Sequence, residues 1–189
     1  MPIELTDEQI VRRALADKEE FGTLIKRYEA KLARYLSRLG LSLPEDREDV
    51  LQNAFLKAYK NLNDFDPELS FSSWMYRITH NEAMSFFRAK KARPTVTLDE
   101  EGLNLLTELK DERADASNEA ELRLSSTELA KALATIDPKY RDILALRYFE
   151  DRSYTEISDI LQVPVGTVST LIHRAKRVVR EALPRHFSL

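Results

Sequence analysis

The chain has 189 residues, of which 43% are hydrophobic and 32% are charged, with only four glycines and a net charge of −3. This composition favours one large or two small, almost entirely helical domains. No cysteine is present, and His80, His173 and His186 lack metal-ligand spacing, so we expect no disulfide, thiolate zinc site or cofactor. No segment has the length and apolarity of a signal core or a membrane span, which predicts a cytoplasmic protein without membrane insertion.

The small net charge hides an uneven distribution along the chain. Residues 99–121 hold nine acids against two bases, a net of −7, whereas residues 174–185 hold five bases against one acid, a net of +4. A second basic cluster is formed by Arg88, Lys90, Lys91 and Arg93. Two basic modules separated by an acidic segment are therefore expected, and basic modules are typical of nucleic-acid binding.

Capping signals predict three helices before residue 61. Thr6 and Gln9 form a capping box for the first helix, and Asp17 is expected to cap a second helix that runs to about residue 39 and stops at Gly40. Pro44 suits the first turn of the third helix. The polar side of that third helix includes Asp46, Asp49, Gln52, Asn53 and Lys57, and by its spacing alone this side would simply be solvated.

Residues 61–70 read as a loop, and Ser70 is expected to cap a fourth helix over about residues 71–91. Aromatic side chains here alternate with cations and amides, a mixture that suits stacking and edge hydrogen bonding of single-stranded bases. Core packing is the competing interpretation, and helical spacing favours it for Trp74, Ile78 and Phe86. Phe65 and Phe71 are the stronger candidates for nucleic-acid contact.

Pro94 ends this helix, and residues 94–117 are acidic and weakly periodic, as expected of a flexible linker between two domains. Residues 118–135 are expected to form the first helix of a C-terminal module. Asp137 and Pro138 predict the start of the next helix, and residues 146–148 are expected to contribute to its core.

Residues 153–183 have the pattern of a helix-turn-helix. Ser153 and Glu156 form a capping box for the first helix, and Pro164 suits the first turn of the second helix. Gln162 stands where the turn would prefer glycine, at some cost in backbone strain. The exposed face of the second helix begins with small and hydroxyl residues and ends in cations. This pattern favours a helix that binds in the DNA major groove over the alternative of an ordinary helical hairpin with solvated charges.

Two segments, residues 46–93 and 136–176, together resemble the two characteristic domains of bacterial sigma factors of the extracytoplasmic-function (ECF) class. The resemblance covers nearly all of the chain except the acidic linker, and it depends on the order and spacing of two independent motifs. It implies an all-α protein with two small helical domains: residues 1–93 as a sigma region 2-like domain, residues 94–117 as the linker, and residues 118–189 as a region 4-like helix-turn-helix domain.

The resemblance also implies which surfaces bind which partners. Asp49, Gln52 and Asn53 would meet the clamp helices of core RNA polymerase, whose large subunits also supply a flap contact. The minus-10 promoter element would be bound by Phe65, Asp66, Ser70, Phe71, Arg77, Asn81, Arg88, Lys90, Lys91 and Arg93. The minus-35 element would be read by Gly166, Thr167, Ser169, Thr170, His173 and Arg174, with Lys176 and Arg177 on phosphates. In this class an anti-sigma factor often clamps the two domains together.

The expected function is that of a sigma factor, which directs core RNA polymerase to specific promoters and assists promoter melting. The alternative is a stand-alone helix-turn-helix transcriptional regulator, which would leave the aromatic and basic helix 71–91 without a role. An enzyme is not expected, because no carboxylate pair, metal set or nucleophile constellation can be placed on one surface.

Overall fold

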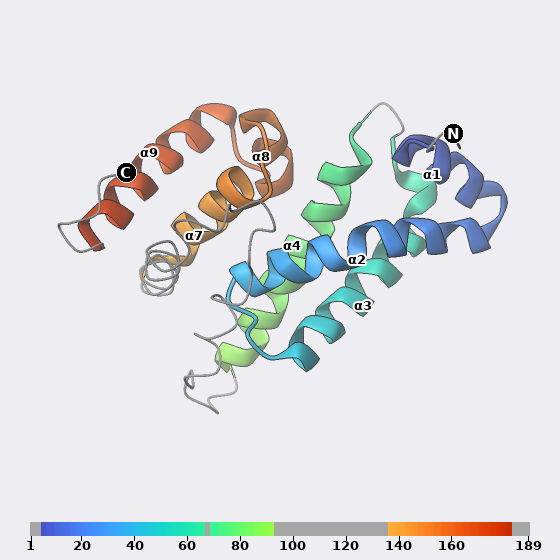
Figure 1. Ribbon diagram of the computed structural model, residues 1–189, viewed down its shortest axis with the longest axis horizontal. Coiled ribbons are helices and arrows are strands. Elements are labelled where there is room, and N and C mark those ends of the chain that lie inside the picture. Colours follow the sequence, from blue (N-terminus) through green and yellow to red (C-terminus); the bar gives the residue numbers. More distant parts are fainter. Residues whose placement is uncertain (1–4, 67–68, 93–135, 183–189) are drawn as a thin grey trace, which may run out of the picture.

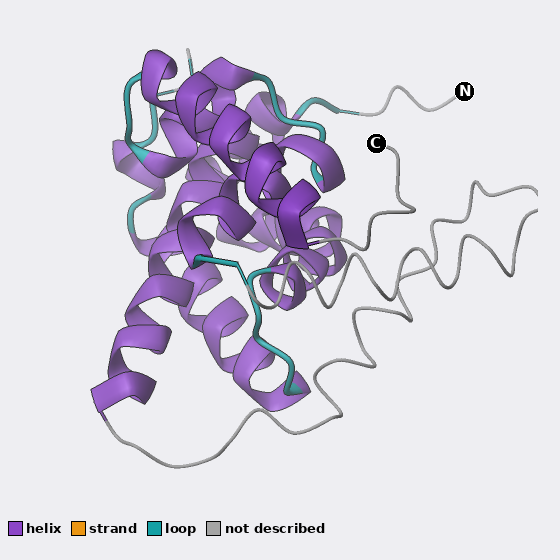
Figure 2. Cartoon of the chain, turned by 90° about the vertical axis from the view of Figure 1, so that its left-hand side faces the viewer, coloured by secondary structure: helices purple, strands orange, loops and turns teal. Residues whose placement is uncertain are grey.

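The computed structural model describes residues 5–66, 69–92 and 136–182, and within these ranges the chain is entirely helical (Figures 1 and 2). The N-terminal bundle consists of α1 (Asp7–Ala16), η1 (Lys18–Glu20), α2 (Phe21–Arg38), α3 (Pro44–Lys60), η2 (Leu62–Asp64) and α4 (Phe71–Ala92). The C-terminal bundle consists of α7 (Pro138–Leu144), η4 (Ala145–Phe149), α8 (Tyr154–Leu161) and α9 (Val165–Ala182). The all-α prediction is confirmed.

Most helices of the N-terminal bundle begin where the sequence predicts. Thr6 and Gln9 form the expected capping box of α1, and the amide of Ser73 donates to the Ser70 hydroxyl at 3.2 Å at the start of α4. Pro44 occupies the first turn of α3. Asp17 differs from its prediction, because its side chain caps the short helix η1 and α2 begins only after that turn.

The core of the N-terminal bundle lies between α2, α3 and α4, with α1 packed across α2. Leu32, Tyr35 and Leu36 of α2 are fully buried there. The hydroxyl of Tyr35 shares a 3.0 Å hydrogen bond with Nδ1 of His80 on α4, and burial lowers the pKa of His80 to about 4. His80 is therefore a neutral core residue at physiological pH.

The helix-turn-helix forms as predicted at α8 and α9. Ser153 and Glu156 complete the capping box of α8, and Gln162 takes the left-handed conformation with φ of 56°. The turn is held by the Ser158 hydroxyl, which donates to the carbonyl of Val163 at 2.6 Å. This local hydrogen bond helps to hold Gln162 in the left-handed conformation, which glycine would adopt with less strain.

The C-terminal bundle differs from its prediction at one point. Asp137 caps α7 through the Lys139 amide, as expected, but the chain then widens into a π-helical turn at η4. Leu146 is buried, as expected, but Tyr148, which was also expected in the core, is 52% exposed. The expected helix over residues 118–135, the acidic linker and Arg93 lie outside the described residues.

No helix in the described ranges is both long and apolar enough to cross a membrane. The two bundles are in direct contact: α8 packs along α4, and η4 reaches the end of α2 (Figure 1). At this boundary Gly40 adopts φ of +104°, and a Cβ at this position would lie 3.1 Å from Nη1 of Arg141. Gly40 thus both ends the α2 segment and leaves room for a guanidinium from the other bundle.

Asp142 on α7 is 5% exposed, and desolvation raises the pKa of its carboxyl to about 7. A carboxyl whose folded pKa lies above its unfolded value stabilises the fold at low pH, and this contribution is lost as the pH rises from about 4 to about 7. We expect Asp142→Asn to raise stability at pH 8 by on the order of 1–3 kcal/mol, with a smaller gain at pH 5.

Thermal unfolding of both proteins at pH 5 and pH 8 checks this expectation. Asp159→Asn, a change at an exposed aspartate of α8, is the control and should shift stability little at either pH. If the difference in stability between the wild type and Asp142→Asn is the same at pH 5 and pH 8, the raised pKa of Asp142 is contradicted.

Candidate nucleic-acid and polymerase interfaces

The second helix of the helix-turn-helix, α9, divides into a buried and an exposed face. Val168, Ile172, Ala175 and Val179 are buried against α7 and α8. The residues predicted to read or hold duplex DNA are all exposed: Gly166, Thr167, Ser169, Thr170, His173, Arg174, Lys176 and Arg177. The structure therefore brings the complete predicted set onto one open helix face.

Two of the exposed cations already interact with other side chains of the chain. The Lys176 ammonium lies 5.4 Å from the centre of the Tyr148 ring, and Nε of Arg177 lies 3.8 Å from the Glu181 carboxylate. Both side chains of the Arg177–Glu181 pair are about 70% exposed, so the pair is weak and can yield to a phosphate. The residues predicted to read bases, Gly166 to Arg174, lie toward the first half of α9, where a recognition helix contacts base edges.

The predicted minus-10 residues differ in their exposure. Asp66, Ser70 and Asn81 are exposed and Arg77 is half-buried, but Phe65 is only 5% exposed and Phe71 only 1%. Their ring centres lie 5.5 Å apart, and each lies within 6 Å of the Trp74 ring centre. The expectation that Phe65 and Phe71 offer their rings to nucleic acid is corrected here: in this conformation both belong to an aromatic core cluster.

The physical reason is local. The helical turn η2 buries Leu62 and turns the following Phe65 inward, while Phe71, at the start of α4, packs edge-to-face on Tyr28 of α2 at 5.6 Å. Edge-to-face pairs add to the stability gained from burial alone. The cluster thus lies directly beside Asp66, which follows Phe65, and Ser70, which precedes Phe71.

The basic end of α4 carries Arg88, Lys90 and Lys91, all exposed. Lys90 is partly neutralised, because its ammonium lies 2.9 Å from the Asp46 carboxylate of α3 and 5.5 Å from the centre of the Phe86 ring. This pairing across two helices was not visible in the sequence. Arg88 and Lys91 are therefore better placed than Lys90 to hold a phosphate.

The predicted polymerase-binding residues Asp49, Gln52 and Asn53 are exposed together along the outer side of α3. Beside them, Leu56 is 51% exposed, and a groove between α2 and α3 is lined by Ile25, Gln52, Phe55 and Leu56 among others. Sequence reasoning missed Leu56. The signal was present, because Leu56 follows Gln52 and Asn53 at helical spacing and so interrupts the polar side with an apolar residue.

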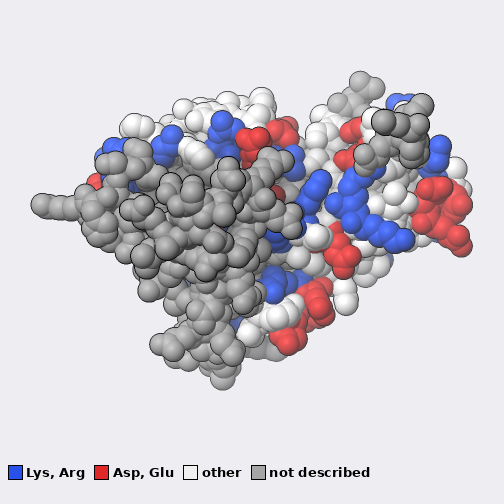
Figure 3. All heavy atoms as spheres, viewed as in Figure 1, with Lys and Arg blue, Asp and Glu red and all other residues white. Residues whose placement is uncertain are grey.

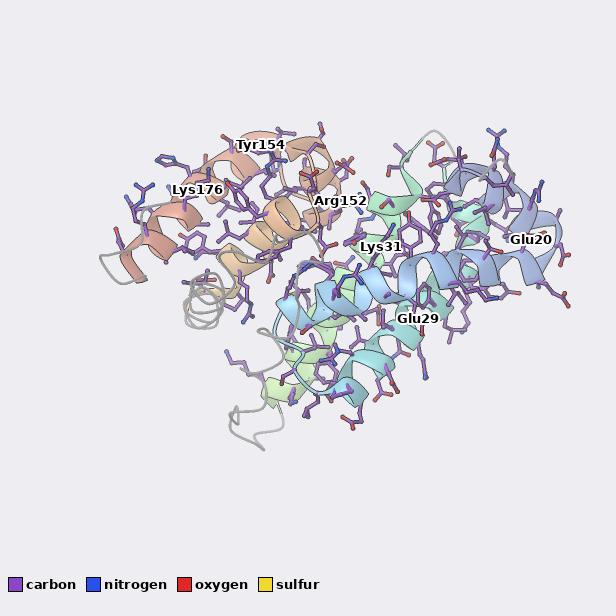
Figure 4. All side chains as sticks on the ribbon, viewed as in Figure 1. Glu20, Glu29, Lys31, Arg152, Tyr154 and Lys176 are labelled. Carbon is purple, nitrogen blue, oxygen red and sulfur yellow. The ribbon has the colours of Figure 1, made fainter. Side chains whose placement is uncertain are left out.

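Charges of both signs lie on the face seen in Figure 3. Lys and Arg side chains are frequent near where the two bundles meet, with some acidic side chains beside them, and a group of Asp and Glu side chains lies at the far end of the N-terminal bundle, around Glu20 (Figures 3 and 4). Within the described ranges, no group of three His, Asp or Glu side chains is placed to hold a metal ion.

Comparisons with known proteins agree with this geometry. Residues 24–93 match the family model for Sigma-70 region 2, and residues 126–178 match that for Sigma-70 region 4. The chain is 35% identical to the ECF RNA polymerase sigma factor SigW of Bacillus subtilis, over 88% of this chain and 90% of that one. It is 32% identical to the ECF RNA polymerase sigma-E factor of Haemophilus influenzae, over 97% and 98% of the two chains.

A solved structure shares the fold. CnrH, determined in complex with the cytosolic domain of CnrY, superposes with a TM-score of 0.67 at 24% identity, over 93% of this chain and 95% of that one. The similarities to these relatives thus run through both bundles and across the segment that joins them.

Proposed function

The chain belongs to the ECF class of sigma factors, the proteins that direct core RNA polymerase to promoters, and from this membership we propose how its surfaces divide that task. The exposed face of α9 reads the minus-35 element, the loop before α4 and the face of α4 engage the minus-10 element, and α3 docks on polymerase. The observation that carries the proposal is that all eight predicted residues of α9 are exposed on one face of a correctly capped helix-turn-helix.

At the minus-35 element, α9 enters the major groove with its N-terminal half. Gly166, Thr167 and Ser169 allow close approach to base edges, and Arg174 is long enough to grip a guanine through two hydrogen bonds. Lys176 and Arg177 lie one turn further on and hold phosphates. The exposed residues of this face before His173 are Gly166, Thr167, Ser169 and Thr170, which are small enough to let the helix sit deep in the groove.

At the minus-10 element, the exposed polar groups of Asp66, Ser70 and Asn81 contact the edge of a base extruded from the non-template strand. Extrusion costs a few kcal/mol of stacking, which a fitted pocket must offset. The aromatic cluster of Phe65, Phe71 and Trp74 anchors the residues next to Asp66 and Ser70 before DNA arrives, and such preorganisation lowers the entropic cost of binding. Arg88 and Lys91 then hold the backbone.

Polymerase docks on the outer side of α3 through Asp49, Gln52, Asn53 and the neighbouring Leu56. An exposed leucine beside a groove, ringed by polar groups, is the arrangement expected of an interface centre. The clamp helices of polymerase are the proposed partner of this side. The C-terminal bundle is the proposed partner of the flap.

We further propose that the chain itself catalyses no reaction and acts in the cytoplasm, where promoter DNA and polymerase are found. An anti-sigma factor stays a proposed partner. The stand-alone regulator is the weaker alternative, because the match of residues 24–93 to Sigma-70 region 2 gives the N-terminal bundle a role that such a regulator does not need.

Arg174→Ala tests the reading of the minus-35 element. If Arg174 contacts a base, the substitution should weaken binding of the cognate promoter by about 1–3 kcal/mol and relax the preference at one position of the element. The measurement is holoenzyme affinity for a set of promoters in which each minus-35 position is varied in turn.

Arg180→Ala is the matched control, because Arg180 is exposed on the last turn of the same helix, beyond the predicted base-reading residues. It should leave the sequence preference unchanged. Uniform weakening across all promoters by Arg174→Ala would show that Arg174 contacts a phosphate and would reject its role in base reading.

A further inference from the structure

One cation of α9 lies at the edge of the exposed face. Lys176 is exposed, and it comes four residues after the buried Ile172 and three residues after the exposed His173. Because residues three and four apart are neighbours on a helix, Lys176 stands on the flank of α9, between its buried face and the face proposed to enter the major groove. Phosphates border the major groove on both sides, so a cation on this flank suits a phosphate contact.

An aromatic ring from another part of the C-terminal bundle lies beside this cation. The Lys176 ammonium is 5.4 Å from the centre of the Tyr148 ring, which belongs to the π-helical turn η4. A cation within about 6 Å of a ring centre is attracted by the negative face of the ring. In Figure 4, Lys176 lies along α9, away from the boundary between the bundles at which Arg152 lies. The contact therefore belongs to the C-terminal bundle alone.

Tyr148 is exposed at a local irregularity of the backbone. The turn η4 spans Ala145–Phe149, and within it Leu146 is buried whereas Tyr148 is 52% exposed. Turns of π-helix are rare and frequently lie at functional sites. At this turn a large aromatic side chain stands on the surface next to α9, where the sequence pattern would place it in the core.

The two cations proposed to hold phosphates have different partners in the free chain. Nε of Arg177 lies 3.8 Å from the carboxylate of Glu181, a negative group that competes with a phosphate. The Tyr148 ring has no net charge, so Lys176 keeps its full positive charge while the ring attracts it. The ring approaches the ammonium from one side, which leaves N–H donors free for a phosphate oxygen. The same ring can thus hold Lys176 both before and after DNA binds.

Such holding matters because a lysine side chain is flexible. Its four-carbon stem loses rotamer freedom when a phosphate fixes the ammonium, and this loss opposes binding. A contact that already restricts the ammonium in the free chain lowers the remaining entropic cost. Exposed contacts between a cation and a ring are weak, so the expected effect on affinity is about two- to fivefold.

We propose that Tyr148 is a positioning residue for promoter binding, whose ring holds the Lys176 ammonium on the flank of α9 in place for a phosphate beside the minus-35 element. This role rests on the proposed function of α9 and of Lys176. It extends the surface that serves the minus-35 element to a residue before the helix-turn-helix. Tyr148 acts on affinity and leaves sequence preference unchanged, because a phosphate contact is the same at every base pair.

The test is the affinity of holoenzyme, formed from core polymerase and the full chain, for promoter fragments. Tyr148→Ala should weaken binding about two- to fivefold, by one factor on all fragments that differ in the minus-35 element. Tyr148→Phe keeps the ring and removes only the hydroxyl, so it should bind as the wild type does. Circular dichroism confirms that each variant is folded before affinities are compared.

A double-mutant cycle shows whether Tyr148 acts through Lys176. In a chain that carries Lys176→Met, the further change Tyr148→Ala should cause no additional loss of affinity. Arg177→Met provides the matched background, because Arg177 is the next cation of α9 and pairs with Glu181. In that background Tyr148→Ala should cause the same loss as in the wild type.

Three results would overturn the positioning role: no loss in Tyr148→Ala, an equal loss when Lys176→Met is present, or a loss in Tyr148→Phe as large as in Tyr148→Ala. The last would mean that the hydroxyl itself contacts DNA. Failure of the proposed function has a different signature. Lys176→Met should lower the slope of log affinity against log salt concentration by about 0.9 if Lys176 neutralises one phosphate. An unchanged slope would reject the phosphate contact of Lys176, and the role of Tyr148 with it.

Discussion

Leu56→Arg is expected to weaken binding to core RNA polymerase at least about 100-fold while changing the free energy of unfolding by less than about 0.5 kcal/mol. Leu56 is 51% exposed on α3, beside Gln52 and Asn53, so an arginine there can extend into solvent without disturbing the core. In the complex, the same side chain would bring an unpaired charge and added bulk into the centre of the interface, where both are costly.

The measurement is a fluorescence titration of labelled chain with core polymerase, paired with urea unfolding of the free chain. Leu15→Arg is the matched control, because Leu15 is also an exposed leucine, 46% accessible, but lies on α1. It should bind polymerase as the wild type does. Equal affinities for the two variants would show that the outer side of α3 is not the docking surface.

Phe71→Ala is expected to lower the free energy of unfolding by about 3–5 kcal/mol. Phe71 is 1% exposed, and its ring contacts those of Tyr28, Phe65 and Trp74 at centre-to-centre distances of 5.5–5.7 Å. Truncation would leave a cavity between α2, α4 and the loop before α4, and neighbouring aromatic rings can collapse into it only in part.

Urea unfolding followed by circular dichroism measures this loss, and Leu56→Ala is the control, with an expected change below about 1 kcal/mol at its exposed position. The outcome separates two roles for Phe71. A core residue gives a large loss of stability in the absence of DNA. Stability close to that of the wild type, combined with impaired opening of promoter DNA, would mean that the ring contacts a base instead.

The helix boundaries could be predicted well because their signals are local. Four helices begin in the structure at the residues that mark their starts in the sequence, and each signal involves groups within three residues of one another. These residues are Thr6 with Gln9, Pro44, Ser70 and Asp137. The same holds for Ser153 and the left-handed Gln162 of the helix-turn-helix. Local hydrogen bonding and fixed dihedral angles depend little on the rest of the fold, so the sequence alone carries them.

The burial of Phe65 and Phe71 could not be predicted in this way. A loop residue and the first residue of a helix are normally accessible, and only the packing of Tyr28, which lies 43 positions before Phe71 in the chain, closes the cluster over them. The π-helical turn at η4 had a similar effect, since it shifted the register of the helix and left Tyr148 exposed. Both errors arose where tertiary packing overrode a local pattern.

The contacts of Glu150 with the N-terminal bundle were likewise not visible in the sequence. Glu150 lies 112 positions from Arg38 and 74 from Tyr76, and nothing in the local pattern distinguishes it from any other surface acid. Leu56 differs from these cases. Its position among the polar residues of α3 could be seen in the sequence, but only the structure showed that its side chain is exposed. The sequence thus predicted which residues of α9 are exposed, but it did not predict the exposed Leu56 on α3 or the contacts between the bundles.

This chain gives core polymerase its choice of promoter, and the most direct test combines core polymerase with the purified chain on a library of promoter sequences. Transcripts should start only when the chain is present, and only from templates that share one pair of upstream elements. A chain that binds those templates alone but neither associates with core polymerase nor yields transcripts would contradict the account.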